Sequence, residues 1–127
     1  MSAIITNIDR DADLTIHTIE GAFTWKDVIA TIDEYYRGQA TTFVIWDYSD
    51  ARNEHCSEDN LKAIARAAGK YVHVRAGGKT ALVVPTDLLF GMARVFEALA
   101  EAENMPIAIQ CFRYISEASA WLKSDVA

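Results

Sequence analysis

Two short apolar runs constrain the fold of this chain more than any other feature of its sequence. They lie at 43–46 and 80–84, are rich in β-branched or aromatic side chains, and do not alternate between apolar and polar residues. Strands of that kind are buried on both faces, which is typical of parallel sheets covered by helices. Each run is followed by a segment in which apolar residues recur at helical spacing. The sequence therefore predicts an α/β domain.

Four segments have the spacing of amphipathic helices, and each begins near a side chain that can cap a helix. The candidate N-caps are Thr24, Ser57, Thr86 and Ser116. Gly38 is expected to end the first helix. The four helices are predicted over residues 24–38, 57–72, 86–104 and 116–122.

Five strands are predicted, over residues 3–8, 14–19, 43–46, 80–84 and 106–112. The first two are joined by a short polar turn, which indicates an antiparallel hairpin. The later strands alternate with helices, so right-handed crossovers and parallel pairing are expected. The predicted order is ββαβαβαβα, in a mixed, mostly parallel sheet with the first strand at its antiparallel edge. Residues 1–127 are expected to form a single domain, with a polar loop over 47–56.

Charge and cysteine content exclude several classes of partner. The formal net charge is -6, from 12 basic and 18 acidic residues, which disfavours binding to nucleic acid and to an acidic membrane surface. No apolar run approaches the ~20 residues of a membrane span, so we expect no membrane insertion. Cys56 and Cys111 form no CxxC pair, which fits a reducing compartment. We therefore expect a cytoplasmic protein.

A polar rim is predicted at the carboxyl ends of the parallel strands, where open α/β sheets bind ligands. Ser57 is its most informative position, because a phosphate at a helix start would meet free backbone N–H groups. A plain helix cap explains Ser57 as well. The candidate switch or interaction rim consists of Asp47, Ser49, Asp50, Ser57, Asn60, Leu61, Thr86 and Asp87.

Aromatic side chains on the predicted helices and strands could line an apolar pocket. Aromatic residues at such spacing also serve as ordinary core, and Met92 and Phe96 could equally belong to the interface of a twofold homodimer. The candidate apolar pocket consists of Trp25, Tyr36, Trp46, Phe90, Phe96 and Trp121.

The chain has no recognisable catalytic or metal-binding motif. Gly78-Lys79-Thr80 resembles the end of a phosphate-binding loop, but it precedes a strand instead of a helix. The acidic residues around His55 could supply oxygen ligands to Mg²⁺ or Ca²⁺, but they match no EF-hand or metalloprotease spacing, and a solvated loop with an acidic helix start explains them equally well. An enzyme that used Asp47, His55 or Cys56 would need those side chains to converge. We accordingly expect no catalytic residue, no metal and no cofactor.

Four stretches of the sequence resemble the bacterial SpoIIAA-like (STAS-like) proteins. The stretches are 43–49, 78–84, 90–96 and 112–122, and their most specific phrases are FGM at 90–92 and EASAWL at 117–122. The resemblance covers nearly the whole chain. It implies a βα superhelix, in which a mixed sheet has helices packed around it.

The resemblance also implies a function. Proteins of this kind act as anti-sigma-factor antagonists, in which an Asp-Ser pair opens a helix and the serine of the pair is phosphorylated. The corresponding place in this chain falls near His55-Cys56, with Ser57 just beyond, so the usual pair is absent. Ser57 and Ser49 are the candidate phosphorylation positions. The fold is also shared by lipid-binding proteins of the CRAL-TRIO type.

We therefore expect a non-enzymatic regulatory or protein-interaction module with an unidentified protein partner. The alternative is a carrier of a small apolar ligand or lipid, with a CRAL-TRIO-like pocket. An apolar cavity in the interior would favour the carrier, whereas a tightly packed interior would exclude it.

Overall fold

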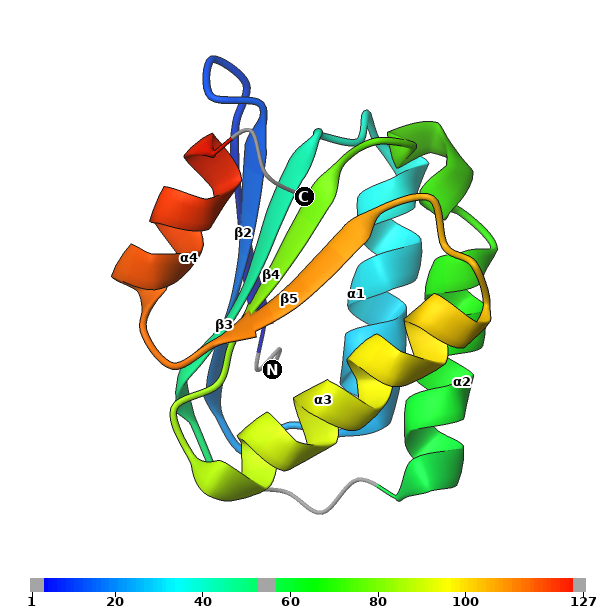
Figure 1. The fold of residues 1–127 in the computed structure, drawn as a ribbon, viewed down its shortest axis with the longest axis vertical. Helices are drawn as coiled ribbons and strands as arrows, with labels where there is room; N and C mark the ends of the chain where they lie inside the picture. The colour runs from blue at the N-terminus through cyan, green and yellow to red at the C-terminus, as the bar shows by residue number, and fades with distance from the viewer. Residues whose placement is uncertain (1–3, 53–56, 125–127) are drawn as a thin grey trace.

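The computed structural model describes residues 4–52 and 57–124. Within these residues, five strands form a single sheet and four α-helices pack around it (Figure 1). The strands are β1 (Ile4–Asp9), β2 (Leu14–Gly21), β3 (Phe43–Ala51), β4 (Lys79–Val83) and β5 (Ala108–Phe112). The helices are α1 (Trp25–Arg37), α2 (Glu58–Gly69), α3 (Asp87–Ala102) and α4 (Ile115–Lys123), with a 3-10 helix, η1 (Val72–Arg75), after α2.

The strands lie in the sheet in the order in which they occur in the chain, β1-β2-β3-β4-β5. β1 pairs with β2 antiparallel, and every later neighbour is parallel. The predicted element order, the mixed sheet and the antiparallel edge strand are therefore confirmed. The register places His17 of β2 beside Thr6 of β1 and beside Trp46 of β3.

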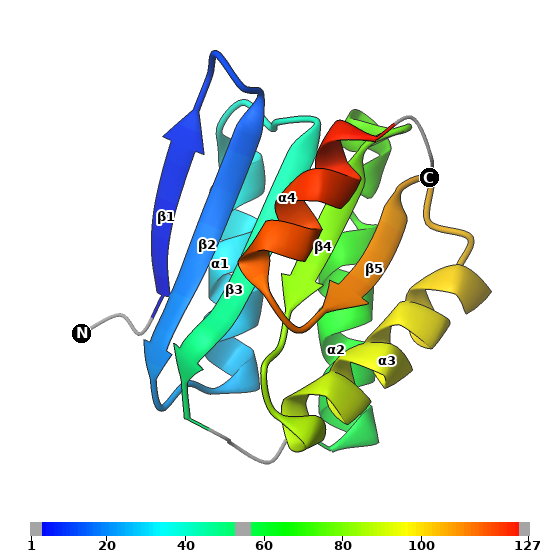
Figure 2. The ribbon, with the colours of Figure 1, turned by 60° about the vertical axis from the view of Figure 1, so that its left-hand side comes forward.

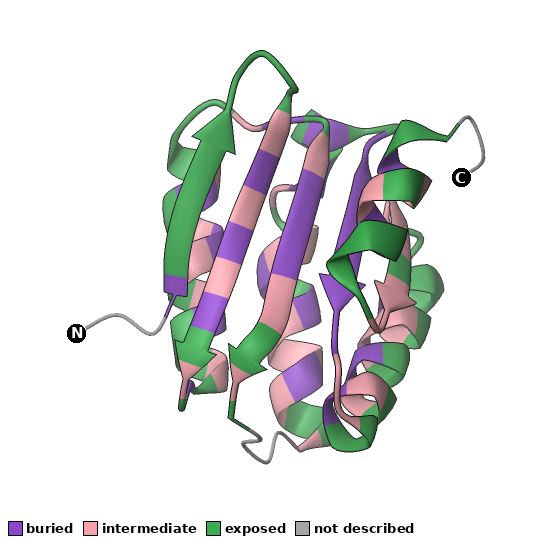
Figure 3. Cartoon of the chain, turned by 90° about the vertical axis from the view of Figure 1, so that its left-hand side faces the viewer, coloured by how far each residue is buried: buried purple, intermediate pink, exposed green. Residues whose placement is uncertain are grey.

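The helices cover the two faces of the sheet unequally. α1, α2 and α3 lie on one face and α4 alone lies on the other (Figures 1 and 2). Alternation along β3 sends Val44 and Trp46 into the core beneath the three helices, and Ile45 into the smaller core beneath α4. β4 is buried along its whole length, whereas β1 is exposed beyond Ile4 (Figure 3).

Three helices begin as their sequences predict. The Thr24 hydroxyl accepts a hydrogen bond from the Asp27 N–H at 3.2 Å, and the Asp27 carboxylate accepts one from the Thr24 N–H at 2.9 Å. This reciprocal pair satisfies two N–H groups that the first turn leaves without helical partners. Ser57 and Thr86 cap α2 and α3 in the simpler one-bond form.

Most predicted boundaries lie within three residues of the observed ones, but the end of the third strand and the cap of the last helix are wrong. Residues 47–51 continue β3 instead of forming a loop, because β2 runs on to Gly21 and pairs with the polar end of β3 beyond an irregularity at residues 18–20. Ser116 does not cap the last helix. That helix begins at Ile115, and the Tyr114 carbonyl accepts the first hydrogen bonds, so no side-chain cap is used.

A buried guanidinium joins the amino ends of β3 and β4 to the carboxyl end of α1. Arg75, only 6% exposed, donates its five N–H groups to five neutral oxygens. The acceptors are the carbonyls of Thr41, Thr42 and Lys79 and the hydroxyls of Tyr36 and Thr80, at 2.8 to 3.4 Å. Gly78 lets the backbone before β4 lie close to the Thr42 carbonyl, since a Cβ at position 78 would lie 2.5 Å from that carbonyl oxygen.

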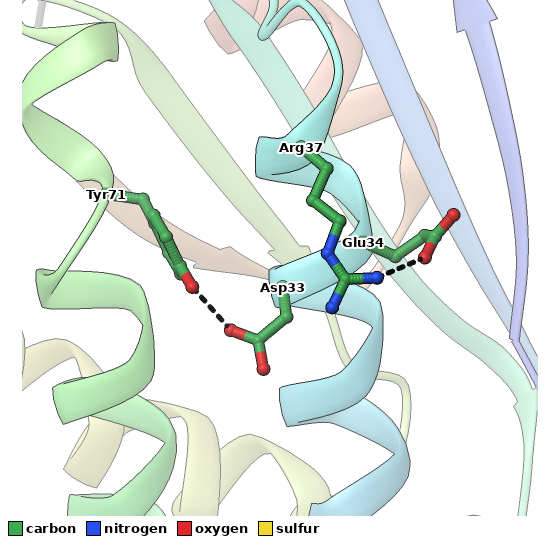
Figure 4. A network of polar contacts seen from close by, with 4 residues as sticks. All are labelled: Asp33, Glu34, Arg37 and Tyr71. Atoms are coloured by element: carbon green, nitrogen blue, oxygen red, sulfur yellow. Dashed lines mark hydrogen bonds and ion pairs between the residues drawn. The ribbon is translucent and has the colours of Figure 1, made fainter.

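A second polar contact holds the chain after α2 against α1. Tyr71 donates its hydroxyl to the Asp33 carboxylate at 2.9 Å (Figure 4). Its ring stacks on that of Tyr36, with 5.1 Å between the ring centroids. The nearby Glu34–Arg37 pair is exposed on both sides. It therefore adds little stability, whereas the Tyr71 contact fixes the position of η1.

Replacing the buried guanidinium should destabilise the protein strongly. We expect Arg75→Lys to lower the free energy of unfolding by about 3 kcal/mol, because one ammonium cannot reach five separated acceptors and leaves buried carbonyls without donors. Urea unfolding would measure the change. Arg66→Lys, on the exposed face of α2, is the matched control and should stay within about 0.5 kcal/mol of the wild type. Equal effects of the two substitutions would contradict the role given to Arg75.

Candidate ligand-binding cavity

An apolar cavity of about 120 Å³ lies between the sheet and the layer formed by α1, α2 and α3. Strands β2 to β5 form one wall, with His17, Trp46 and Leu82 among the lining residues. The three helices form the other wall, with Ile32, Ile64 and Phe96 among theirs. The lining is mostly aliphatic and aromatic, as in sites for small molecules.

Small side chains on two helices help to leave this space. Ala68 of α2 and Ala93 of α3 both line the cavity. Their methyl groups reach less far toward the sheet than the Leu or Ile side chains that usually fill an α/β interior. The alanines of these two helices therefore account for part of the cavity volume.

His17, on β2, is a polar residue of the sheet wall. Its side chain is fully buried, and its Nδ1 lies 2.8 Å from the Thr6 hydroxyl. The Trp46 ring lies against it at 4.2 Å between centroids, and Tyr35 meets it edge to face at 5.3 Å. Nε2 has no hydrogen-bond partner among the described residues.

The electrostatic setting keeps His17 neutral. Burial lowers the pKa of His17 to about 4, because an imidazolium would lose its hydration, and the positive charge of Arg75 acts in the same direction. At neutral pH the ring therefore carries one proton, on Nδ1 or on Nε2.

A network of hydroxyl groups lies at the amino end of β3 and reaches the cavity through Tyr35. Thr41 is 1% exposed, and its hydroxyl lies within 3.0 Å of the hydroxyls of Thr15 and Tyr35. Its carbonyl accepts from Arg75 at 2.8 Å. Since Arg75 uses all five of its donors on protein oxygens, it offers no free N–H group to the cavity.

The structure divides the six residues of the predicted pocket. Trp25, Tyr36, Trp46 and Phe96 line the cavity. Phe90 packs at the edge of the same core beneath the Arg113 guanidinium, which lies 4.3 Å from its ring centre, and does not line the cavity. Trp121 lies on the opposite face of the sheet, against Phe112.

Met92, like Phe96, also lines the cavity. Both side chains are partly buried and pack against the core, and the twofold homodimer interface stays a prediction.

Several lining residues were not singled out in the sequence. A usable signal existed for His17, because Thr15, His17 and Ile19 alternate with more exposed neighbours and share the buried face of β2. A polar ring on an apolar face marks a candidate site. Arg75 gave no such signal, because its burial depends on carbonyls that only the folded chain brings together.

The predicted rim is present in part. Asp47 accepts hydrogen bonds from the Ser49 N–H and hydroxyl, and Asp50 is exposed beside them. Ser57 is half-buried and accepts from the Asn60 N–H at 3.1 Å. These hydrogen bonds form a turn and a helix cap within the chain. They therefore account for the polar residues without any need for a binding partner.

Three further residues complete the placement of the rim. Thr86 caps α3, and the exposed carboxylate of Asp87 lies 2.9 Å from Arg113. Leu61 is buried and lines the cavity, so its side chain is not on the rim.

The other chemical hypotheses find little in the described residues. Lys79 is buried, and its ammonium donates to the carbonyls of Trp121 and Ser124 at the end of α4, so it acts as a helix anchor. No group of three acidic, histidine or cysteine side chains within 4–52 and 57–124 could hold a metal. His55 and Cys56 lie outside the described residues.

Within residues 4–52 and 57–124, no helix is both long enough and apolar enough to cross a membrane.

Comparison with known proteins identifies the fold through structure alone. Neither protein-family profiles nor curated protein sequences match this chain. The anti-sigma factor antagonist SpoIIAA in its unphosphorylated form superposes with a TM-score of 0.54 and 13% identity, over 96% of this chain and 99% of that one. The Bacillus cell fate determinant SpoIIAA in its phosphorylated form gives 0.52 and 17%, over 95% and 100%. The chain therefore has the SpoIIAA-like (STAS-like) fold that its sequence resembles.

Proposed function

We propose that this protein is a non-enzymatic binding protein for a small apolar molecule. The cavity between the sheet and the three-helix layer carries the proposal, because it is lined chiefly by apolar side chains and remains open in a core that could have been filled. A cytoplasmic location is part of the proposal and is supported by the free thiol of Cys111.

The cost of the cavity supports a role for it. At roughly 24 cal/mol per Å³, the cost of enclosed core cavities, filling a space of this volume would stabilise the folded state by at most about 3 kcal/mol. Larger side chains at Ala68 or Ala93 could recover much of that energy. A ligand that fills the space would stabilise the folded state in the same way.

The volume limits the ligand to one ring or a short chain. A dry apolar cavity of about 150 Å³ holds a single benzene molecule. The cavity here is somewhat smaller, so a complete acyl chain would need the helices to move apart. The carrier function is therefore proposed for a compact apolar ligand and not for a lipid of full length.

A second candidate function is a protein-interaction module switched by phosphorylation. It is supported by the fold shared with the anti-sigma factor antagonist SpoIIAA and by the position of Ser57 at the start of α2. A phosphate on Ser57 would lie at the positive end of that helix, although the side chain would give up its bond to the Asn60 N–H.

Filling the cavity should block ligand binding. We expect Ala93→Leu to weaken toluene binding at least tenfold and to raise the free energy of unfolding by about 1 kcal/mol, because the larger side chain occupies the space. Heteronuclear NMR titration and thermal unfolding would measure the two effects. Ala98→Leu, on the exposed face of the same helix, should leave affinity unchanged. Failure of both toluene and its hydroxyl-bearing analogue phenol to bind the wild-type cavity would contradict the proposal.

The second candidate predicts a phosphorylated serine in cells. Protein isolated from its native host should carry phosphate on Ser57 or Ser49, detectable by peptide mass spectrometry. A Ser57→Ala, Ser49→Ala double variant is the control and should lose the modified peptides. Repeated absence of phosphate from both serines under several growth conditions would remove the switch.

The neutral state of His17 predicts a specific loss of stability in acid. Its folded pKa of about 4 lies below the ordinary value of 6.5, so the unfolded chain binds the proton first and stability falls as the pH drops from about 6.5 toward 4. Between pH 7 and pH 5 the loss from this group should be about 2 kcal/mol. Urea unfolding should show that His17→Gln lacks this loss and that His73→Gln, at an exposed position, retains it. The same slope in all three proteins would show that His17 is not buried and neutral.

A further inference from the structure

The polar atom His17 Nε2 is an exception within the apolar cavity. The residue is fully buried, lines the cavity, and lies on the face of β2 that points toward the three helices. No described backbone or side-chain group bonds to Nε2. Its neighbours are the rings of Trp46 and Tyr35, which are weak partners for an N–H group and none for a nitrogen lone pair. Buried polar atoms normally have a partner, so this one points to a ligand.

We infer that the ligand of this cavity is a compact apolar molecule bearing one hydroxyl group, which bonds to His17 Nε2. The inference rests on the proposed ligand-binding function and narrows its chemical class.

The hydroxyl is selected by the partner of the other ring nitrogen. His17 Nδ1 is hydrogen-bonded to the Thr6 hydroxyl, which accepts the bond if Nδ1 carries the proton and donates it if Nδ1 does not. Nε2 is correspondingly an acceptor in one tautomer and an N–H donor in the other. A hydroxyl group on the ligand both donates and accepts, so it satisfies Nε2 in either state. A ligand carbonyl can only accept and a protonated amine can only donate, so each would satisfy Nε2 in one state alone.

A carboxylate fits this site poorly. The nearest buried cation, Arg75, already gives its five N–H groups to protein oxygens, so it has none for a second acceptor. His17 is neutral at physiological pH and cannot form an ion pair. A charged ligand would therefore lose its hydration without a matching partner. These conditions favour a neutral alcohol or phenol over an acid of the same size.

Phenol, toluene and benzoate form a matched set of probes, because each has one ring and differs in its substituent. Affinities for the wild type and for His17→Leu would be measured by NMR titration, with thermal unfolding as the check that the variant folds. Leucine keeps the bulk and removes the polar atom. We expect the ratio of phenol affinity to toluene affinity to fall at least tenfold in His17→Leu, and benzoate to bind the wild type at least tenfold more weakly than phenol.

A second measurement does not depend on the variant. The ¹⁵N resonance of His17 Nε2 in the wild-type protein should move when phenol is added and should move much less with toluene. His17→Gln, whose amide can donate and accept, should restore part of the preference for phenol.

The outcomes separate the two proposals. If toluene and phenol both bind and the ratio of phenol affinity to toluene affinity is unchanged in His17→Leu, the hydroxyl inference is overturned and the ligand-binding function stands. The same conclusion follows if both bind and the Nε2 resonance does not move when phenol is added. If benzoate binds as well as phenol, the choice of a neutral ligand is overturned. If no probe binds the wild type and Ala93→Leu changes nothing, the proposed function fails as well.

Discussion

The buried Arg75 guanidinium is the interaction on which the amino-terminal end of the sheet depends. It gathers carbonyls from the approaches to β3 and β4 and hydroxyls from α1 and β4, and all of its acceptors are neutral. A buried cation normally needs either an anion or full hydrogen bonding, and here hydrogen bonding alone serves. Because β3, β4, α1 and η1 all contact this one group, Arg75 fixes their positions relative to one another. Arg75 also lines the cavity, so this polar cluster lies at one end of it.

Hydrogen bonds extend from this polar cluster to the strand that carries His17. Thr41 and Tyr35 continue the hydrogen bonds of Arg75 toward β2, where Thr15 meets them. His17 is the next inward-facing residue on that strand, and its ring is held by Thr6, Trp46 and Tyr35. The orientation of His17 is thus determined by neighbours on three elements. A polar atom held so firmly in an apolar space is prepared for a ligand before the ligand arrives, which reduces the entropy lost on binding.

The sequence was sufficient to predict the architecture because that depends on local patterns. Continuous apolar runs placed β3 and β4, and the caps at Thr24, Ser57 and Thr86 placed three helices. The failures were at positions decided by distant partners. The polar residues of 47–51 stay in β3 because β2 extends to meet them, and Trp121 leaves the predicted pocket because α4 packs on the opposite face. Burial of Arg75 and the unpaired nitrogen of His17 are likewise consequences of tertiary contacts.

The shared fold does not by itself decide where this protein works. In the SpoIIAA-like arrangement the helix start at Ser57 lies on the carboxyl rim, yet the rim residues described here mostly satisfy one another, as Asp47 does with Ser49 and Ser57 with Asn60. Among the described residues, two buried side-chain nitrogens have no hydrogen-bond partner, Trp121 Nε1 on the α4 side of the sheet and His17 Nε2, and of the two only His17 lines the cavity. Since a buried polar group without a partner costs more than an exposed one, which water can satisfy, its persistence is stronger evidence of a binding role. The cavity is therefore a better candidate for the site of function than the rim.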